Sequence, residues 1–357
     1  MSRLLGFLAH ILGTTRYFSG LQPWLVRNGP HITIRRHFQV SILGGSNPVA
    51  QTLCLLLKEH PFISRLLLLD CTKSTCGVAM DLSHIPSEPI VQGLTYSKNT
   101  ALASTDIVVV ASAEPRKLFQ TDYDLFRTNT SLIINSMKEI CTYCPKAFIV
   151  DLTEPINYTV PFISLVLEAS NAYDKGKVLG VTGRDAMRAQ ACLQQLYKLP
   201  PDKPISVPVI CGHSPTTTVP LLSHVTPWFN VNNFAAVMIT EHVRGTENKL
   251  ITVKGGEGQS SISMAYAGFW TVAAILKALS GCPMKHIAFV ANDEYKTKYF
   301  AAPATITKDG ITEVANYKVL SILEAAYLQN AIRELANDVS HSEMYFKELK
   351  EKNPFKI

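Results

Sequence analysis

The sequence predicts an α/β protein, with a doubly wound parallel sheet over residues 38–182 and an α+β domain over residues 183–357. Three observations support this class. From Phe38 onward, short apolar strands alternate with longer amphipathic stretches, as in βαβ units. The strands are almost continuously apolar, as expected when helices cover both faces of a sheet. After Thr182 the alternation ends, and helices mix with isolated β-rich segments.

The first domain is predicted to contain five strands and three helices. The strands are Val40–Leu43, Leu66–Asp70, Ile107–Ala111, Phe148–Leu152 and Val178–Val181, and the helices are Val49–Lys58, Thr121–Cys141 and Val160–Ser170. The second domain is predicted to begin with a helix over Arg184–Tyr197 and a proline-rich link over 200–204. β-prone segments, a long helix from about Ser261 and a C-terminal helix from Tyr317 follow.

Composition indicates a folded protein without an extended basic surface. The 357 residues are 47% hydrophobic and 17% charged, with 19 Gly and 20 Pro, which excludes collagen-like and largely disordered chains. Residues 1–37 hold five arginines and no acid, so they carry +5 of the net charge of +6. The remaining +1 gives no sign of nucleic-acid binding. No apolar run reaches the ~18 residues of a membrane span, so we expect no transmembrane segment.

The first 37 residues have the character of a targeting sequence. They are rich in arginine, contain hydroxyl residues, lack acids and place apolar residues at amphipathic spacing, as in mitochondrial transit peptides. We therefore expect a protein of the mitochondrial matrix; a disordered tail is the alternative. The eight cysteines are expected to be buried free thiols, which suits a reducing compartment. Cys141 and Cys144 form a lone Cys-x-x-Cys without a second pair at zinc-finger spacing, so no metal site is expected.

The turn after the first strand indicates a dinucleotide-binding, Rossmann-type domain. The segment Gly44–Ala50 leaves a strand and opens a helix, where backbone N–H groups can meet a pyrophosphate. Gly44 suits the tight turn, Asn47 tolerates left-handed φ, and Pro48 can occupy the first helical position. Asp70 ends the second strand 26 residues after Gly44, where a carboxylate binds ribose hydroxyls and repels a 2′-phosphate. The pattern favours NAD over NADP; an ordinary loop with a surface acid is the alternative.

Among the ten histidines, His213 has the most suggestive position. It follows the apolar, strand-like run Val207–Gly212, so its side chain can point into a cleft. Asp185 and Arg188 are three residues apart on a predicted helix and therefore share one face. A His–Asp pair can act as a general acid and base, and arginine can hold a carboxylate by two hydrogen bonds. Spacing alone leaves a purely structural role open for these residues.

A set of short motifs extends through both domains. They are Ser64-Arg65-Leu66 through Asp70, Gly77–Ile85, Pro115-Arg116-Lys117, Asp124-Leu125-Phe126, Gly180-Val181-Thr182, Asp185, Arg188-Ala189, Val207–Ile210, Gly212-His213 and Ser263–Gly268. With these motifs the chain, from about Phe38 to Leu349, resembles the mitochondrial malate dehydrogenases of the lactate/malate dehydrogenase family. The resemblance implies hydride transfer between NAD and the malate/oxaloacetate pair, a step of the tricarboxylic acid cycle.

The resemblance also implies roles for four residues at the substrate. His213 would give a proton to the oxaloacetate carbonyl or take one from malate, and Asp185 would orient His213. Arg188 would bind the carboxylate next to the reacting carbon. Arg116, on a mobile loop, would bind the distal carboxylate. Two carboxylate-binding arginines imply a four-carbon dicarboxylate as substrate.

Cofactor and subunit contacts are implied in the same way. Asp70 would hold the adenosine ribose, Gly44 would line the pyrophosphate turn, and Met264 would lie near the nicotinamide, with simple core packing as the alternative for Met264. The resemblance implies a homodimer, with the helix that carries Asp81–Ile85 near the interface. His84 would then be an interface residue.

Three departures from the family pattern put the activity in question. The active-site loop reads Leu118–Asp122, with Asp122 where the family has a second arginine that polarises the reacting carbonyl. Glu154 stands where the family has an asparagine that contacts substrate and cofactor, and Ala113 replaces a glycine close to the cofactor. Loss of one donor to developing negative charge lowers a rate by roughly 100- to 1,000-fold. Two alternatives follow: a catalytically impaired relative that serves as a binding or subunit partner, and an enzyme for a less anionic 2-oxo acid.

Overall fold

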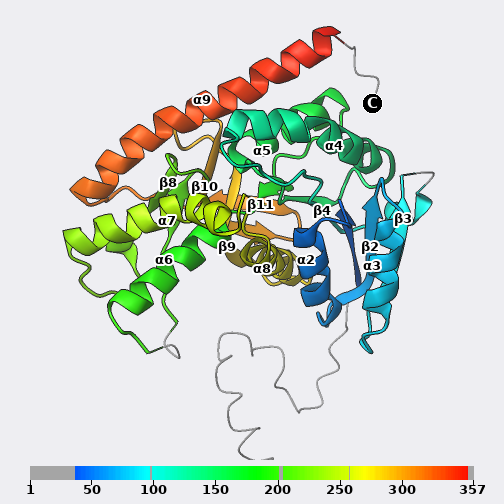
Figure 1. Ribbon diagram of the computed structural model, residues 1–357, viewed down its shortest axis with the longest axis horizontal. Helices are drawn as coiled ribbons and strands as arrows, with labels where there is room; N and C mark the ends of the chain where they lie inside the picture. The colour runs from blue at the N-terminus through cyan, green and yellow to red at the C-terminus, as the bar shows by residue number, and fades with distance from the viewer. Residues whose placement is uncertain (1–36, 97–98, 201–203, 257, 353–357) are drawn as a thin grey trace, which may run out of the picture.

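The computed structural model describes residues 37–96, 99–200, 204–256 and 258–352 (Figure 1). The expected transit peptide, apart from His37, lies outside the described residues. The described chain folds around one mixed sheet of 11 strands, in the order β3-β2-β1-β4-β5-β6-β9-β10-β7-β8, with β11 pairing with β10.

The first half of the sheet is parallel and has helices on both faces, which is the Rossmann arrangement. Its strands are β1 (Phe38–Leu43), β2 (Ile63–Asp70), β3 (Ile90–Thr95), β4 (Ile107–Val110), β5 (Phe148–Asp151) and β6 (Val178–Gly180). The connecting helices are α2 (Pro48–Lys58), α3 (Ser74–Ser83), the 3-10 helix Thr100–Ser104, α4 (Asp122–Tyr143) and α5 (Ile156–Ala169). The four residues of β4 are fully buried, which agrees with the continuously apolar pattern of the sequence.

The second half is α+β and continues the same sheet in antiparallel pairing. Its strands are β7 (Val209–Cys211), β8 (Thr218–Pro220), β9 (Met284–Ala291), β10 (Tyr299–Thr307) and β11 (Gly310–Val314). Its helices are α6 (Gly183–Leu196), the 3-10 helix Leu222–His224, α7 (Asn233–Val253), α8 (Ile262–Leu279) and α9 (Ile322–Lys352). The long helix α9 crosses the molecule beside α5 (Figure 1). The predicted fold class is confirmed.

One long apolar helix bears on the expectation about membrane spans. Helix α8 has 18 residues and a mean hydropathy of 1.5, so by length and composition it could cross a bilayer. Two thirds of it, 67%, is buried inside the fold, and it packs against α2 and β9. The burial of α8 accounts for its apolar composition as that of a core helix.

The structure corrects several expectations about individual residues and elements. Asn47 is not left-handed: its φ is −67°, and its side chain caps α2 by accepting the Val49 N–H. Pro48 is the first helical residue, as predicted. The cysteines are free, but not all are buried, since Cys71, Cys76 and Cys282 are exposed. Strand β3 and helix α7 were missed.

Candidate active site

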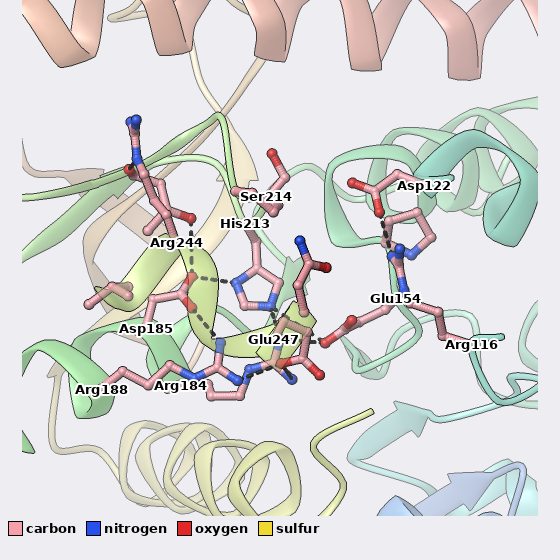
Figure 2. A pocket seen from close by; sticks show the side chains of 15 residues that line it. Arg116, Asp122, Glu154, Arg184, Asp185, Arg188, His213, Ser214, Arg244 and Glu247 are labelled. Atoms are coloured by element: carbon pink, nitrogen blue, oxygen red, sulfur yellow. Dashed lines mark hydrogen bonds and ion pairs between the residues drawn. The ribbon is translucent and has the colours of Figure 1, made fainter. Parts of the chain in front are cut away.

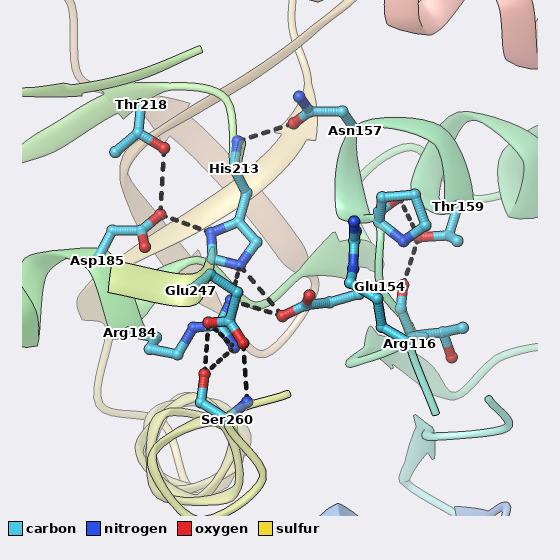
Figure 3. Close-up of polar contacts among 12 residues, drawn as sticks. Arg116, Glu154, Asn157, Thr159, Arg184, Asp185, His213, Thr218, Glu247 and Ser260 are labelled. Atoms are coloured by element: carbon cyan, nitrogen blue, oxygen red, sulfur yellow. Dashed lines mark hydrogen bonds and ion pairs between the residues drawn. The ribbon is translucent and has the colours of Figure 1, made fainter. Parts of the chain in front are cut away.

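The site is built around His213, which follows β7 and lies near the first turns of α5 and α6. Its backbone N–H donates to Asn157 Oδ1 at 2.8 Å, which ties the histidine to the start of α5 (Figure 3). Its Nδ1 lies 2.5 Å from Asp185 Oδ2, at the first turn of α6. Both side chains are almost completely buried. The structure thus brings together the two residues that the sequence suggested for proton transfer.

Arg184 contacts the other ring nitrogen of this histidine. Its Nη2 lies 2.8 Å from His213 Nε2 and 2.5 Å from Glu154 Oε1. Its Nη1 donates to Ser260 Oγ at 2.9 Å and lies 3.5 Å from the Glu247 carboxylate. Arg184 is 2% exposed and Glu154 is 5% exposed, so the two form a buried ion pair beside the histidine.

The neighbours of His213 act on its pKa in opposite directions. Burial lowers the pKa, the Asp185 carboxylate raises it and the Arg184 charge lowers it, and the net result is a pKa raised to about 9. The contact with Arg184 nevertheless requires an unprotonated Nε2, because a guanidinium offers only donors. Protonation of Nε2 therefore requires that the Arg184 guanidinium withdraw from the ring. Glu154 Oε1, 3.7 Å from Nε2, is an acceptor on the same side.

The acids of the site are held in their charged forms. Burial raises the pKa of Glu154, but the Arg184 charge and His213 outweigh it and hold that pKa far below its usual range. Burial likewise raises the pKa of Asp185, and His213 and the nearby arginines bring it below the ordinary value. The pKa of Glu247 is lowered in the same way, chiefly by Arg184 against the effect of burial. These carboxylates are anions at neutral pH.

Arg188, expected to bind a substrate carboxylate, contacts a carboxylate of the protein itself. Its Nη2 lies 2.5 Å from Glu247 Oε2 and 2.9 Å from Ser260 Oγ, and its Nη1 lies 3.6 Å from Asp185 Oδ1. Glu247, from α7, also accepts the Ser260 N–H at 2.8 Å. A substrate carboxylate at Arg188 would have to share the guanidinium with Glu247 or displace it.

Arg116, expected to bind the distal carboxylate, is paired in the same way. It forms an ion pair with Asp122, the first residue of α4, and donates to the Gln120 carbonyl at 3.2 Å (Figure 2). The acid that replaces the family's second loop arginine therefore neutralises the first one. Within the part of the chain that the structure describes, Arg116 Nε is buried without a hydrogen-bond partner.

These side chains line one small cavity of about 50 Å³, which has room for only a few water molecules. Its lining includes four arginines and four acids: Arg116, Arg184, Arg188, Arg244, Asp122, Glu154, Asp185 and Glu247 (Figure 2). A cavity of this size admits a four-carbon dicarboxylate only if some of these side chains move. Since the charged groups are balanced in number, the pocket has no strong excess of positive charge.

A second, larger cavity of about 430 Å³ lies beside the first, next to the turn that opens α2. It is lined by the start of α2, by residues 111–117 and by residues around Lys254–Ser261, and Arg116 lines both cavities. Gly44 has φ of +85° and lies so close to Ala111 that a Cβ would come within 2.6 Å of its carbonyl carbon. The Asp70 carboxylate accepts the Ser46 N–H at 3.0 Å, so it faces the glycine turn, and hydrogen bonds from Ser46 and Cys71 offset burial and lower its pKa.

Some expected and some unexpected residues complete this description. Met264 is 1% exposed in the apolar core and lines neither cavity, so core packing describes it better than a nicotinamide contact. His84 lies on the surface, 3.9 Å from Asp81. Among the described residues, no cluster of three or more His, Cys, Asp or Glu side chains could hold a metal ion.

Sequence reasoning missed Arg184, Glu247 and Ser260. Arg184 immediately precedes Asp185, so its presence at the start of the same helix was the available signal. Glu247 and Ser260 are 59 and 72 residues from Arg188, and no local pattern marks such distant partners.

Comparison with known proteins identifies the family. Residues 38–180 match the model of the NAD-binding domain of lactate/malate dehydrogenases, and residues 182–345 match that of the family's α/β C-terminal domain. The chain belongs to the lactate/malate dehydrogenase family. It is 32% identical over 329 residues to the mitochondrial malate dehydrogenase of Pongo abelii, covering 91% of this chain and 97% of that one. It is 33% identical to the mitochondrial malate dehydrogenase of Homo sapiens, covering 87% and 93%.

Solved structures of the lactate/malate dehydrogenase family share the fold. The malate dehydrogenase of Cryptosporidium parvum superposes with a TM-score of 0.76 at 22% identity, over 86% of this chain and 99% of that chain. The lactate dehydrogenase of the same organism, solved with lactic acid and NAD, superposes with a TM-score of 0.74 at 20% identity, over 86% and 98%. The family is NAD-dependent.

Proposed function

We propose that this protein is an NAD-dependent dehydrogenase that interconverts malate and oxaloacetate. The observation that carries the proposal is the buried His213–Asp185 pair, 2.5 Å apart, in a cavity that also contains Arg116 and Arg188. Family membership and similarity to mitochondrial malate dehydrogenases support the choice of substrate. When bound, NADH supplies the hydride that reduces the ketone carbon.

The chain's own residues would supply the proton and hold the substrate. In the reduction of oxaloacetate, His213 Nε2 gives its proton to the ketone oxygen, and Asp185 stabilises the imidazolium that precedes this transfer. Arg188 and Arg116 bind the two carboxylates after they are released from Glu247 and Asp122. In the oxidation of malate the proton moves from the hydroxyl to Nε2. The expected site residues thus remain His213, Asp185, Arg116 and Arg188, with Gly44 and Asp70 at NAD.

The cellular setting and assembly are part of the same proposal. The arginine-rich, acid-free segment 1–37 and the mitochondrial relatives support a mitochondrial transit peptide and a matrix location. We propose that residues 38–182 form the NAD-binding domain and residues 183–357 the substrate domain. A homodimer is proposed from the resemblance, with the surface of α3 near its interface.

The test is turnover by the purified protein without its first 37 residues. NADH consumption with oxaloacetate is measured beside the variant His213→Ala, and NADH binding to both proteins is measured by fluorescence. The proposal expects similar NADH binding and a rate that falls by at least ~100-fold in the variant, as for loss of a general acid. Equal rates in the two proteins would reject catalysis, and failure of both to bind NADH would place the fault in the cofactor cleft.

A second candidate function is that of a catalytically impaired subunit or binding partner. The observation in its favour is that the arginines expected to bind substrate are paired with the protein's own acids, Arg116 with Asp122 and Arg188 with Glu247. The experiment is to measure the double variant Asp122→Arg/Glu154→Asn beside the unchanged protein. A rise of orders of magnitude in turnover supports impairment. Normal turnover by the unchanged protein excludes it.

A further inference from the structure

The Arg184 guanidinium lies beside Nε2, the ring nitrogen of His213 that would donate the proton. Any ketone oxygen that receives a proton from Nε2 must come within about 2.6–3.2 Å of it. Arg184 Nη2 already lies 2.8 Å from Nε2. When an oxygen takes that place, the guanidinium must move off Nε2, but it stays within the same cavity, because Arg184 enters the cavity from the first turn of α6, beside Asp185 (Figure 3).

The guanidinium of Arg184 is anchored in the cavity by contacts other than the one with His213. Its guanidinium is held by Ser260 Oγ at 2.9 Å and by two carboxylates, those of Glu154 and Glu247. Its side chain is 3% exposed and comes from a helix, whereas Arg116 comes from the segment between β4 and α4. Donors that are already oriented and shielded from water stabilise developing charge with little reorganisation.

Hydrogen-bonding capacity remains available in this group. Among the described residues, the Nε of Arg184 is buried without a partner. Buried N–H groups of a guanidinium are ordinarily hydrogen-bonded to protein or water, so this N–H has one hydrogen bond still to give to a bound water or ligand. Arg116 Nε, on the opposite side of the same cavity, is unpartnered in the same sense.

We propose that Arg184 is the carbonyl-polarising residue of this protein and performs from α6 the task for which the active-site loop supplies only Asp122. The inference rests on the proposed function. As the ketone carbon accepts the hydride, negative charge grows on the ketone oxygen, and Arg184 stabilises it until the His213 proton arrives. Glu154 is the counter-ion that keeps the guanidinium in the cavity before substrate binds. Arg184 is thus a catalytic residue, not an obstruction.

The experiment compares NADH-dependent reduction of oxaloacetate by the unchanged protein, Arg184→Gln, Arg184→Lys and the double variant Glu154→Gln/Arg184→Gln. Arg184→Gln is expected to lower kcat by ~100- to 1,000-fold, as for loss of one oxyanion donor. Arg184→Lys retains the positive charge but not the planar guanidinium, so its kcat should fall less than that of Arg184→Gln. The double variant removes both buried charges, so it tests the same loss without stranding Glu154. Arg333→Gln, on the exposed face of α9, is the matched control and should retain kcat.

A second readout needs neither cofactor nor substrate. The Arg184 charge lowers the pKa of His213, so Arg184→Gln is expected to raise that pKa in the ligand-free protein. NMR titration of the His213 ring measures the shift. The other charged groups of the cavity are kept unchanged: Arg116, Asp122, Glu154, Asp185, Arg188, Arg244 and Glu247. An unchanged pKa would mean that the guanidinium does not lie on Nε2, and would overturn the inference.

The outcomes separate the inference from the proposed function. If the unchanged protein turns over and the variants without Arg184 are equally fast or faster, Arg184 obstructs the site and the inference is wrong, while the function stands. If the unchanged protein is no faster than His213→Ala, the proposed function is wrong and the inference fails with it. Loss of kcat in both the single and the double variant, with the pKa shift, supports the inference.

Discussion

The Arg184–Glu154 ion pair allows a quantitative test of how burial changes the value of a charge pair. Glu154→Gln removes one partner and leaves the Arg184 guanidinium with the Glu247 carboxylate at 3.5 Å and Ser260 Oγ at 2.9 Å. Breaking a buried pair from one side lowers the free energy of unfolding by about 3–5 kcal/mol. Because the guanidinium keeps these partners, we expect Glu154→Gln to lower the free energy of unfolding by ~3 kcal/mol. Arg184→Gln leaves the Glu154 carboxylate facing the His213 ring at 3.7 Å, and we expect it to lower the free energy of unfolding by ~5 kcal/mol.

The chain contains a matched control for this measurement. Lys298 and Glu343 are 2.6 Å apart, close to the 2.5 Å of the buried pair, but the lysine side chain is 71% exposed, against 3% for Arg184. Removal of one partner from such an exposed pair changes stability by only ~0–1 kcal/mol. The comparison of Glu343→Gln with Glu154→Gln therefore varies burial at nearly constant distance.

The assay is urea-induced unfolding at neutral pH, followed by circular dichroism, with the slope m checked for each variant. The double variant Glu154→Gln/Arg184→Gln should be less destabilised than the sum of the single variants, because it leaves neither charge unpaired. Glu154 has a lowered pKa, so its contribution is present above its unfolded value near ~4.3 and is lost as the pH falls through its folded value. Equal losses for the buried and exposed pairs, or simple additivity in the double variant, would refute the reasoning.

Three further predictions concern the site. Asp122→Asn releases Arg116 from its ion pair, so KM for oxaloacetate should fall about tenfold, equivalent to ~1.4 kcal/mol. Steady-state kinetics measure this KM, and an unchanged or higher value would contradict the proposed role of Arg116. Asp185→Asn removes the carboxylate that raises the pKa of His213 to about 9, so the alkaline limit of oxaloacetate reduction should move to lower pH and the rate should fall by ~100- to 10,000-fold; an unmoved limit in the pH profile would be inconsistent with this pair. Asp70→Ser should weaken NADH binding and reduce the ratio of NADH affinity to NADPH affinity, both measured by fluorescence titration. An unaltered ratio would contradict a contact between Asp70 and the ribose.

Much of the fold could be predicted because its signals are local. Strands such as β4 are apolar throughout, and Gly44 starts a turn immediately after a strand. Strand β3 was not predicted, because Ile90–Thr95 lies at the sheet edge, is partly exposed and mixes polar and apolar residues with Gly93. Helix α7 was not predicted, because much of its surface is exposed and its row of buried apolar residues is narrow.

The site was predictable in its residues but not in their pairing. The sequence indicated that His213 and Asp185 could meet, and the structure places them 2.5 Å apart, while their roles stay predictions. Asp122 and Glu154 were recognised as acids that face an anionic substrate. Asp122 instead contacts Arg116, six residues earlier, and Glu154 contacts Arg184 at the start of α6. Neither separation is one that helix or strand periodicity would mark. Arg184 was overlooked because its partner Glu154 is 30 residues away.

The reciprocal contact of Arg184 and Glu154 also restricts how this pocket can change over generations. A mutation in either codon alone strands a charge inside the protein, whereas coordinated replacement of both removes the conflict. We therefore expect the two positions to be inherited as a unit. Descendant and sister genes that encode arginine at the first position should encode an acid at the second, and lineages that have lost one should have lost both.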